Sequence, residues 1–144
     1  MNIQTAHLKF NAKEMIARKT SDIALIILHH RCGDGDIESI HMQHIGRGWA
    51  GIGYHYYIRR DGTVYEGRPV QFVGAHCPNN NSKSIGICLE GDFRKVQPSK
   101  EQLTACKELI AKLRKDIPSI KRVLNHNDLY KTLCPVVNLK ELVK

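Results

Sequence analysis

The apolar residues of the chain fall into short runs that are separated by polar, turn-forming stretches. The longest aliphatic run, Ile23–Leu28, is continuous, which is typical of a strand buried on both faces of a sheet. Ser84–Leu89 forms a second apolar run, and Val123–Leu124 forms a third and shorter one. These three runs predict three strands of a buried sheet.

Two further strands are predicted by a hairpin pattern. Alternating aromatic residues lie on both sides of Asp61-Gly62, between Tyr54 and Glu66, and Asp-Gly suits a tight hairpin turn because that turn needs positive φ. Helices are expected where apolar residues recur at helical spacing behind a capping residue. We expect them at 36–45 and at 99–113, where Ser99-Lys100-Glu101-Gln102 forms a capping box, with shorter ones at 12–19 and 139–143.

Strands and helices that interleave along a chain are typical of the α/β class. We therefore predict a single domain, residues 1–144, with a mixed central β-sheet flanked by helices, on which residues 1–20 pack as an N-terminal extension. The length of 144 residues agrees with this, since one hydrophobic core typically serves ~100–200 residues. The charged fraction of 25% is ordinary, which argues against disorder.

The chain is basic, with 22 Lys and Arg residues against 14 Asp and Glu residues and a formal net charge of +8. Such a domain can bind nucleic acid, an anionic surface or an anionic polymer, and charge alone does not choose among them. No basic helix or aromatic-basic strand motif is present, so a nucleic-acid partner is not expected. No apolar run approaches the ~20 residues of a membrane span, and the first residues do not resemble a signal peptide, so we expect neither a span nor export by that route.

Candidate chemistry lies in histidine and cysteine residues near the ends of the predicted strands. His29 ends one strand, at the position where α/β proteins place their sites, and His126 and Cys134 flank a polar loop after another strand. Zinc is commonly held by nitrogen and sulfur, and catalytic zinc has three protein ligands plus a water. The spacing alone leaves two interpretations open, a zinc site or residues with structural roles. The five cysteines form no CxxC pair and are expected to be reduced.

Four blocks of sequence occur in a characteristic order between Asp22 and Leu139. They are IILHH, GWAGIGYHYYIRRDGTVYEGR, VGAHCPNNNSKSIGICLEGDF and LNHNDLYKTLCP. Together they resemble the zinc-dependent N-acetylmuramoyl-L-alanine amidases, the family of phage lysozyme-type amidases and peptidoglycan-recognition proteins. The resemblance implies a mixed sheet with flanking helices and a zinc cleft at the strand ends. It also implies hydrolysis of the amide between N-acetylmuramic acid and L-alanine in peptidoglycan.

The resemblance extends to individual residues. The metal ligands of the family fall on His29, His126 and Cys134, which implies one zinc ion, although the adjacent His30 competes with His29. Because successive side chains of a strand point to opposite faces, only one of these two histidines can face the cleft, and the motif favours His29. The remaining positions are a catalytic tyrosine at Tyr54, a second catalytic position at Thr132, and two substrate-binding positions at His76 and Glu90.

The resemblance leaves alternatives for function. The chain can be an endolysin-like enzyme that lyses the cell wall, a non-catalytic domain that binds peptidoglycan or muramyl peptide, or a regulatory partner of a phage RNA polymerase. The presence of both histidines, Tyr54 and Cys134 favours catalysis. We therefore expect a monomeric amidase that is made in the cytoplasm, acts on the wall after release or delivery, and is attracted to peptidoglycan by its positive charge.

Overall fold

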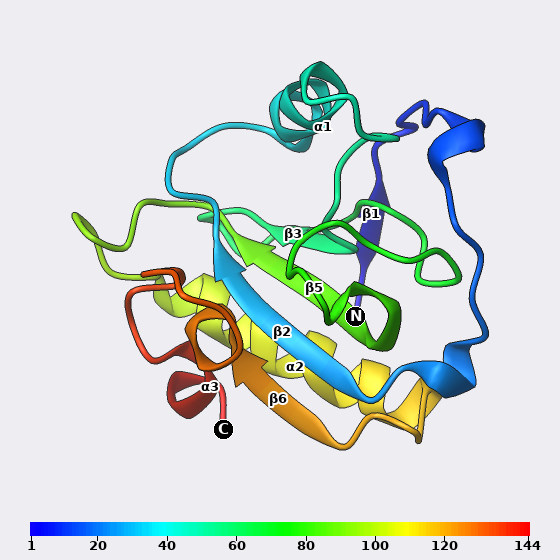
Figure 1. The fold of residues 1–144 in the computed structure, drawn as a ribbon. Coiled ribbons are helices and arrows are strands. Elements are labelled where there is room, and N and C mark those ends of the chain that lie inside the picture. The colour runs from blue at the N-terminus through cyan, green and yellow to red at the C-terminus, as the bar shows by residue number, and fades with distance from the viewer.

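The fold is built on a six-stranded mixed sheet with the strand order β1-β4-β3-β5-β2-β6 (Figure 1). The computed structural model describes all residues from 1 to 144. Only β3 and β4 pair antiparallel, and the other neighbours are parallel. The strands are β1 (Ile3–Thr5), β2 (Leu25–His30), β3 (Tyr56–Ile58), β4 (Val64–Glu66), β5 (Ser84–Leu89) and β6 (Arg122–Asn125). The helices are α1 (Ile37–Gly46), α2 (Lys100–Asp116) and α3 (Leu139–Leu142), with short 3-10 turns at Ala12–Glu14, Thr20–Asp22, Asn81–Lys83 and His126–Asp128.

Strand β2 lies at the centre of the parallel part of the sheet. It pairs with β5 on one side and with β6 on the other, and all six of its residues are buried. Burial on both faces explains why its sequence is a continuous aliphatic run rather than an alternating one. The strand begins two residues later than the predicted run and includes both His29 and His30.

Helices cover the two faces of the sheet. Figure 1 shows α2 running behind β2, β5 and β6, and its residues Leu109 and Leu113 join the main core together with Ile26 and Leu28 of β2. On the other face, Ile37 and Ile40 of α1 pack with Tyr57 and Cys88. The result is a three-layer α/β domain, as the sequence predicts.

Helix α2 begins at the predicted capping box. The Ser99 hydroxyl accepts a hydrogen bond from the backbone N–H of Gln102 at 3.0 Å, and the Gln102 side chain accepts one from the N–H of Ser99 at 3.0 Å. These two bonds satisfy amide groups that a helix start otherwise leaves unpaired. The cap thereby fixes where α2 starts against the sheet.

The N-terminal segment differs from the prediction. The helix expected at 12–19 is absent, and only a 3-10 turn forms at Ala12–Glu14 before the chain becomes extended at Met15. Ala17 instead forms a bridge with Phe72, and β1 adds a parallel edge strand beside β4. The segment gains its hydrogen bonds from the sheet and the loop at Phe72, so no local helix is needed to satisfy its backbone. No helix of the protein combines the length and apolar character needed to cross a bilayer.

Candidate metal centre

Three residues predicted as metal ligands come together at one edge of the sheet. His29 lies near the carboxyl end of β2, His126 follows the carboxyl end of β6, and Cys134 lies in the loop beyond it. One ligand atom from each residue lies within 4.8 Å of the others. Since β2 and β6 are parallel neighbours, their carboxyl ends meet at the same edge, which brings residues about 100 positions apart into one group.

The two adjacent histidines of β2 point to opposite faces of the sheet. His29 is in register with Cys88, whose side chain packs on the α1 face. His30 points to the α2 face, where its Nδ1 accepts a hydrogen bond from the N–H of Phe93 at 3.1 Å. His29 is therefore the histidine that faces His126 and Cys134, whereas His30 anchors the chain that follows β5.

The ring of His126 is a buried polar group that the protein itself does not satisfy. Both of its nitrogens are buried and have no hydrogen-bond partner. Its ring lies 4.4 Å from the His29 ring and stacks on Tyr130 at 5.6 Å, measured between centroids. A buried ring nitrogen without a partner is costly, and a metal ion bound at one nitrogen would relieve part of that cost.

Cys134 supplies the sulfur of the group. Its Sγ lies 3.8 Å from Nδ1 of His29, and it accepts a hydrogen bond from the backbone N–H of His30 at 3.4 Å. Two imidazole nitrogens and one thiolate are a donor set that zinc favours, so the residues present fit this metal. Catalytic zinc sites typically use three protein ligands, which is the number that this group offers.

Burial sets the protonation states of the group. It lowers the pKa of both His29 and His126, with the neighbouring His126 and His30 adding to the effect on His29, so both rings are neutral near pH 7. Burial also raises the pKa of the Cys134 thiol to about 12. Neutral imidazoles are ready to bind a cation, whereas the sulfur needs a nearby cation to become a thiolate.

Two hollows meet at the metal group. One of about 410 Å³ is lined by residues that include Trp49, Tyr54, His76 and His126. The other, of about 430 Å³, includes Tyr54, His126, Thr132 and Cys134. Tyr54 and His126 line both hollows, so open space lies next to the three candidate ligands on more than one side.

Tyr54 and Thr132 lie next to the three candidate ligands. The ring of Tyr54 lies 5.0 Å from the ring of His29, and burial raises the pKa of Tyr54 well above its ordinary value, so the phenol keeps its proton. The Thr132 hydroxyl accepts a hydrogen bond from the N–H of Cys134 at 3.2 Å. That bond shapes the loop carrying the sulfur and leaves the hydroxyl proton free to be donated into the cleft.

The loop that carries Tyr54 is braced by two histidines of α1. Nδ1 of His41 accepts a hydrogen bond from the N–H of Ile52 at 3.0 Å, and Nδ1 of His44 accepts one from Gly53 at 2.8 Å. The sequence alone did not reveal these supports. The sequence feature that could have indicated them is the pair His41 and His44, which lie one helical turn apart and close in sequence to the GIGY block.

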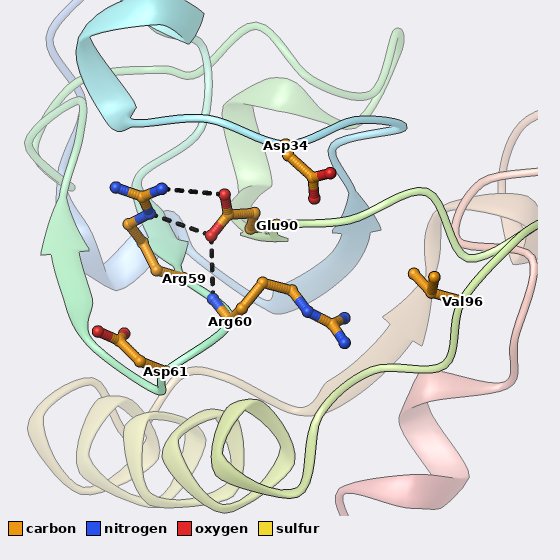
Figure 2. Close-up of a pocket in the computed structure, with 6 residues that line it drawn as sticks. All are labelled: Asp34, Arg59, Arg60, Asp61, Glu90 and Val96. Carbon is orange, nitrogen blue, oxygen red and sulfur yellow. Dashed lines mark hydrogen bonds and ion pairs between the residues drawn. The ribbon is translucent and has the colours of Figure 1, made fainter.

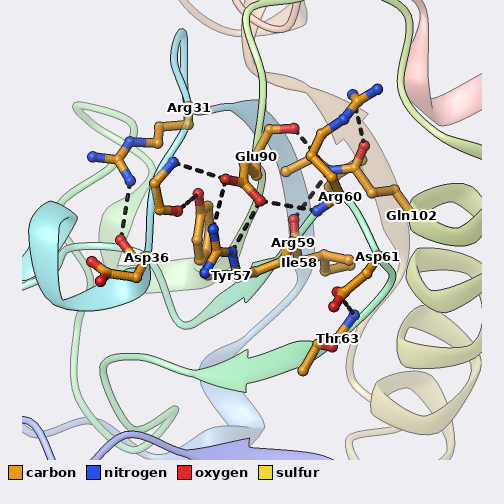
Figure 3. Close-up of polar contacts among 12 residues, drawn as sticks. Arg31, Asp36, Tyr57, Ile58, Arg59, Arg60, Asp61, Thr63, Glu90 and Gln102 are labelled. Carbon is orange, nitrogen blue, oxygen red and sulfur yellow. Dashed lines mark hydrogen bonds and ion pairs between the residues drawn. The ribbon is translucent and has the colours of Figure 1, made fainter.

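Glu90 lies apart from the metal group. It lines a separate hollow of about 590 Å³ with Asp34, Arg59, Arg60, Asp61 and Val96 (Figure 2). Its buried carboxylate forms an ion pair with Arg59 and accepts backbone hydrogen bonds from Gly35 and Arg60 (Figure 3). Burial opposes ionisation, but these hydrogen bonds outweigh it and lower the pKa of Glu90 to about 2. The oxygens of Glu90 are engaged in these structural bonds. The substrate contact predicted for Glu90 stays a prediction.

The sequence model that describes N-acetylmuramoyl-L-alanine amidases matches residues 19–136, most of the chain. The chain belongs to this amidase family. The match extends from the segment before β2 to the residues just beyond Cys134, so it includes all three candidate ligands.

Relatives of this amidase-family chain include insect recognition proteins and phage enzymes. Peptidoglycan-recognition protein LB of Drosophila melanogaster is 40% identical over 102 residues, which cover 69% of this chain but 43% of that relative. The endolysin of Enterobacteria phage K11 is 35% identical over 116 residues, which cover 77% of this chain and 76% of the endolysin. Among solved structures, the N-acetylmuramoyl-L-alanine amidase LysC from Clostridium intestinale URNW superposes with a TM-score of 0.89 at 32% identity, covering 99% of this chain and 95% of that one.

Proposed function

We propose that this protein is a zinc-dependent amidase that hydrolyses the bond between N-acetylmuramic acid and L-alanine in peptidoglycan. The observation that carries the proposal is the group of His29, His126 and Cys134 beside Tyr54 in a cleft of an amidase-family fold. The donor types, the unpartnered ring nitrogens of His126 and the family membership all support it.

His29, His126 and Cys134 would hold one zinc ion. When bound, zinc supplies Lewis acidity, which polarises a carbonyl and lowers the pKa of water. The protein's part is to present two neutral imidazoles and a sulfur at a fixed edge of the sheet. It also places these residues beside a hollow that water and substrate would enter.

Tyr54 and Thr132 supply hydrogen-bond donors to the scissile amide. The phenol of Tyr54 keeps its proton across the neutral range, so its O–H can donate to the oxygen on which negative charge develops. The Thr132 hydroxyl can donate to the same oxygen or orient the attacking water. In the hydrolysis, the oxygen of water joins the carbonyl carbon, the carbon–nitrogen bond breaks, and the amine of L-alanine leaves with a proton from the water.

The positive charge of the chain fits a wall polymer as substrate. Peptidoglycan and the polymers attached to it are anionic, and a formal charge of +8 would favour their encounter with the cleft. We propose that the protein acts as a monomer at the cell wall. This attraction acts over a long range between charges that face solvent, so added salt weakens it.

A binding function without hydrolysis is the second candidate. It is favoured by the recognition proteins among the relatives, one of which, peptidoglycan recognition protein LE, is solved in complex with tracheal cytotoxin, a monomeric diaminopimelic acid-type peptidoglycan. That structure superposes with a TM-score of 0.83 at 27% identity. Binding and hydrolysis would use the same cleft, so they are separated by the chemistry of the product.

Digestion of purified sacculi tests the proposal. The zinc-loaded protein should release free L-alanine amino termini, detected by mass analysis, and a chelator should abolish the release until zinc is restored. Cys134→Ser should bind zinc weakly and lose hydrolysis while still binding sacculi. Intact sacculi after incubation with protein shown to contain one zinc would refute the amidase proposal and leave the binding function.

A further inference from the structure

A series of hydrogen bonds starts at the Nε2 side of the His29 ring, opposite the Nδ1 side that faces Cys134. Nε2 of His29 lies 2.9 Å from Nδ1 of His76, and Nε2 of His76 lies 3.3 Å from Oγ of Ser84. The Ser84 hydroxyl in turn donates to the backbone oxygen of Asn80 at 2.7 Å. His29, His76 and Ser84 are all buried, so little solvent competes for these hydrogen bonds.

The last hydrogen bond of the series, from Ser84 to Asn80, determines the direction of the other bonds. A serine hydroxyl has one hydrogen, and Ser84 uses it for Asn80, so Ser84 can only accept from His76. Nε2 of His76 must therefore carry the proton. This series of hydrogen bonds contains no carboxylate that would stabilise a charged ring. His76 is therefore neutral, and its Nδ1 is an acceptor. His29 must then donate from Nε2, which leaves the lone pair on Nδ1, the nitrogen that faces Cys134.

The ring of His76 is held in place by its surroundings. A Cβ at Gly86 would lie 2.7 Å from Cγ of His76, and one at Gly74 would lie 2.8 Å from its Cδ2, so two glycines make room for the ring. The side-chain oxygen of Asn81 accepts hydrogen bonds from the backbone N–H groups of both His76 and Cys77 at 2.9 Å. These contacts fix the loop before β5 and leave the ring little freedom to turn.

We propose that His76 and Ser84 are positioning residues that fix His29 in its Nε2–H tautomer and aim Nδ1 at the metal. The inference rests on the proposed zinc site. It assigns His76 a role different from substrate binding, because both ring nitrogens are already engaged. Groups that orient a ligating imidazole in this way typically change metal affinity by about 10- to 100-fold when they are removed.

The tautomer can be measured directly on the full-length, zinc-free protein. Long-range ¹H–¹⁵N correlation spectra of histidine side chains distinguish Nε2–H from Nδ1–H rings. We expect His29 and His76 both to be Nε2–H tautomers in the unmodified protein, and His29 to become a mixture in Ser84→Ala. Ser119→Ala, which removes a serine hydroxyl that donates to the backbone oxygen of Thr20 and takes no part in this series of bonds, should leave both rings unchanged. An Nδ1–H ring at His29 in the unmodified protein would overturn the proposal.

Zinc affinity gives a second readout, which does not depend on hydrolysis. Competition with a chromogenic chelator should show that His76→Leu binds zinc about 10- to 100-fold more weakly, and His76→Asn, which keeps an acceptor oxygen near the position of Nδ1, should recover part of the loss. Circular dichroism would establish that each variant is folded. Affinities of His76→Leu and the unmodified protein within twofold of each other would refute the positioning role.

These readouts separate failure of this inference from failure of the proposed function. If zinc binds and the tautomers are as expected, but sacculi remain intact, the positioning role stands and the amidase proposal fails. If sacculi are digested but zinc affinity is unchanged in His76→Leu, the amidase proposal stands and the positioning role fails.

Discussion

Replacing Glu90 by glutamine removes a negative charge from a buried carboxylate while preserving its shape. The carboxylate accepts hydrogen bonds from Nε and Nη2 of Arg59 at 3.0 and 3.1 Å, from the N–H of Gly35 at 2.8 Å and from the N–H of Arg60 at 3.0 Å (Figure 3). It thereby ties the end of β5 to the hairpin and to the turn before α1. In Glu90→Gln the two hydrogens of the amide point toward groups that are themselves donors.

The size of the effect follows from the pKa of Glu90. Folding lowers this pKa from an ordinary 4.5 to about 2, and at about 1.4 kcal/mol for each tenfold change the ionised form contributes about 3 kcal/mol to stability. The Arg59 side chain is 34% exposed, so solvent screens part of its share. We expect Glu90→Gln to lower the free energy of unfolding by about 2 to 3 kcal/mol near pH 7.

The pH dependence provides the sign of this effect. Because the pKa is lower in the folded state, the stabilisation is fully present above about pH 4.5 and is lost as the pH falls toward 2. Urea unfolding of zinc-free protein should therefore show the two proteins differing at pH 7, differing less at pH 3 and converging near pH 2. Arg94→Gln, which breaks the exposed Arg94–Asp92 pair, is a matched control and should have no measurable effect. A difference that stays constant from pH 7 to pH 3 would refute the reasoning. Hydrolysis by folded Glu90→Gln at the unmodified rate would count against a substrate contact.

Three further predictions concern the cleft, the core and the charge. Tyr54→Phe should lower kcat on sacculi by about 10²- to 10³-fold with zinc content unchanged. Tyr65→Phe, which removes a hydroxyl outside the cleft, should retain activity. Equal rates for Tyr54→Phe and the unmodified protein would exclude Tyr54 as a donor. Leu109→Ala should lower the free energy of unfolding by about 2 to 5 kcal/mol in chemical denaturation, because Leu109 is fully buried between α2 and the sheet; a loss below about 1 kcal/mol would contradict this packing. Binding of zinc-free protein to sacculi in sedimentation assays should weaken as salt rises, and flat binding would leave the charge of +8 without this role.

The closeness of His29 and His126 follows from few features of the fold, whereas their role as metal ligands rests on the family resemblance and stays a prediction. A continuous aliphatic run predicts a buried parallel strand, and the carboxyl ends of such strands meet at one edge. His29 and His126 therefore had to lie close together once β2 and β6 were neighbours. The aliphatic pattern does not determine the exact bounds of the strand, and β2 starts at Leu25 rather than at Ile23.

Contacts made by loops were beyond the reach of the sequence pattern. The partners of Glu90 come from the hairpin and from the turn before α1, and His76 meets His29 only through the packing of the loop before β5. Neither pairing follows a periodicity of 2 or 3.6 residues. The N-terminal segment was mispredicted for a related reason, because its partners, β4 and Phe72, lie about 50 to 60 positions away in sequence.

The two histidines at the end of β2 also constrain how this strand can change during evolution. Side chains alternate along a strand, so deleting or inserting one residue between Leu25 and Leu28 would exchange the faces of His29 and His30. The imidazole of the metal group would then enter the core, and the imidazole that holds Phe93 would enter the cleft. The parity of β2 therefore excludes a change of its length by an odd number of residues, whereas the loop between His126 and Cys134 has no such parity to preserve.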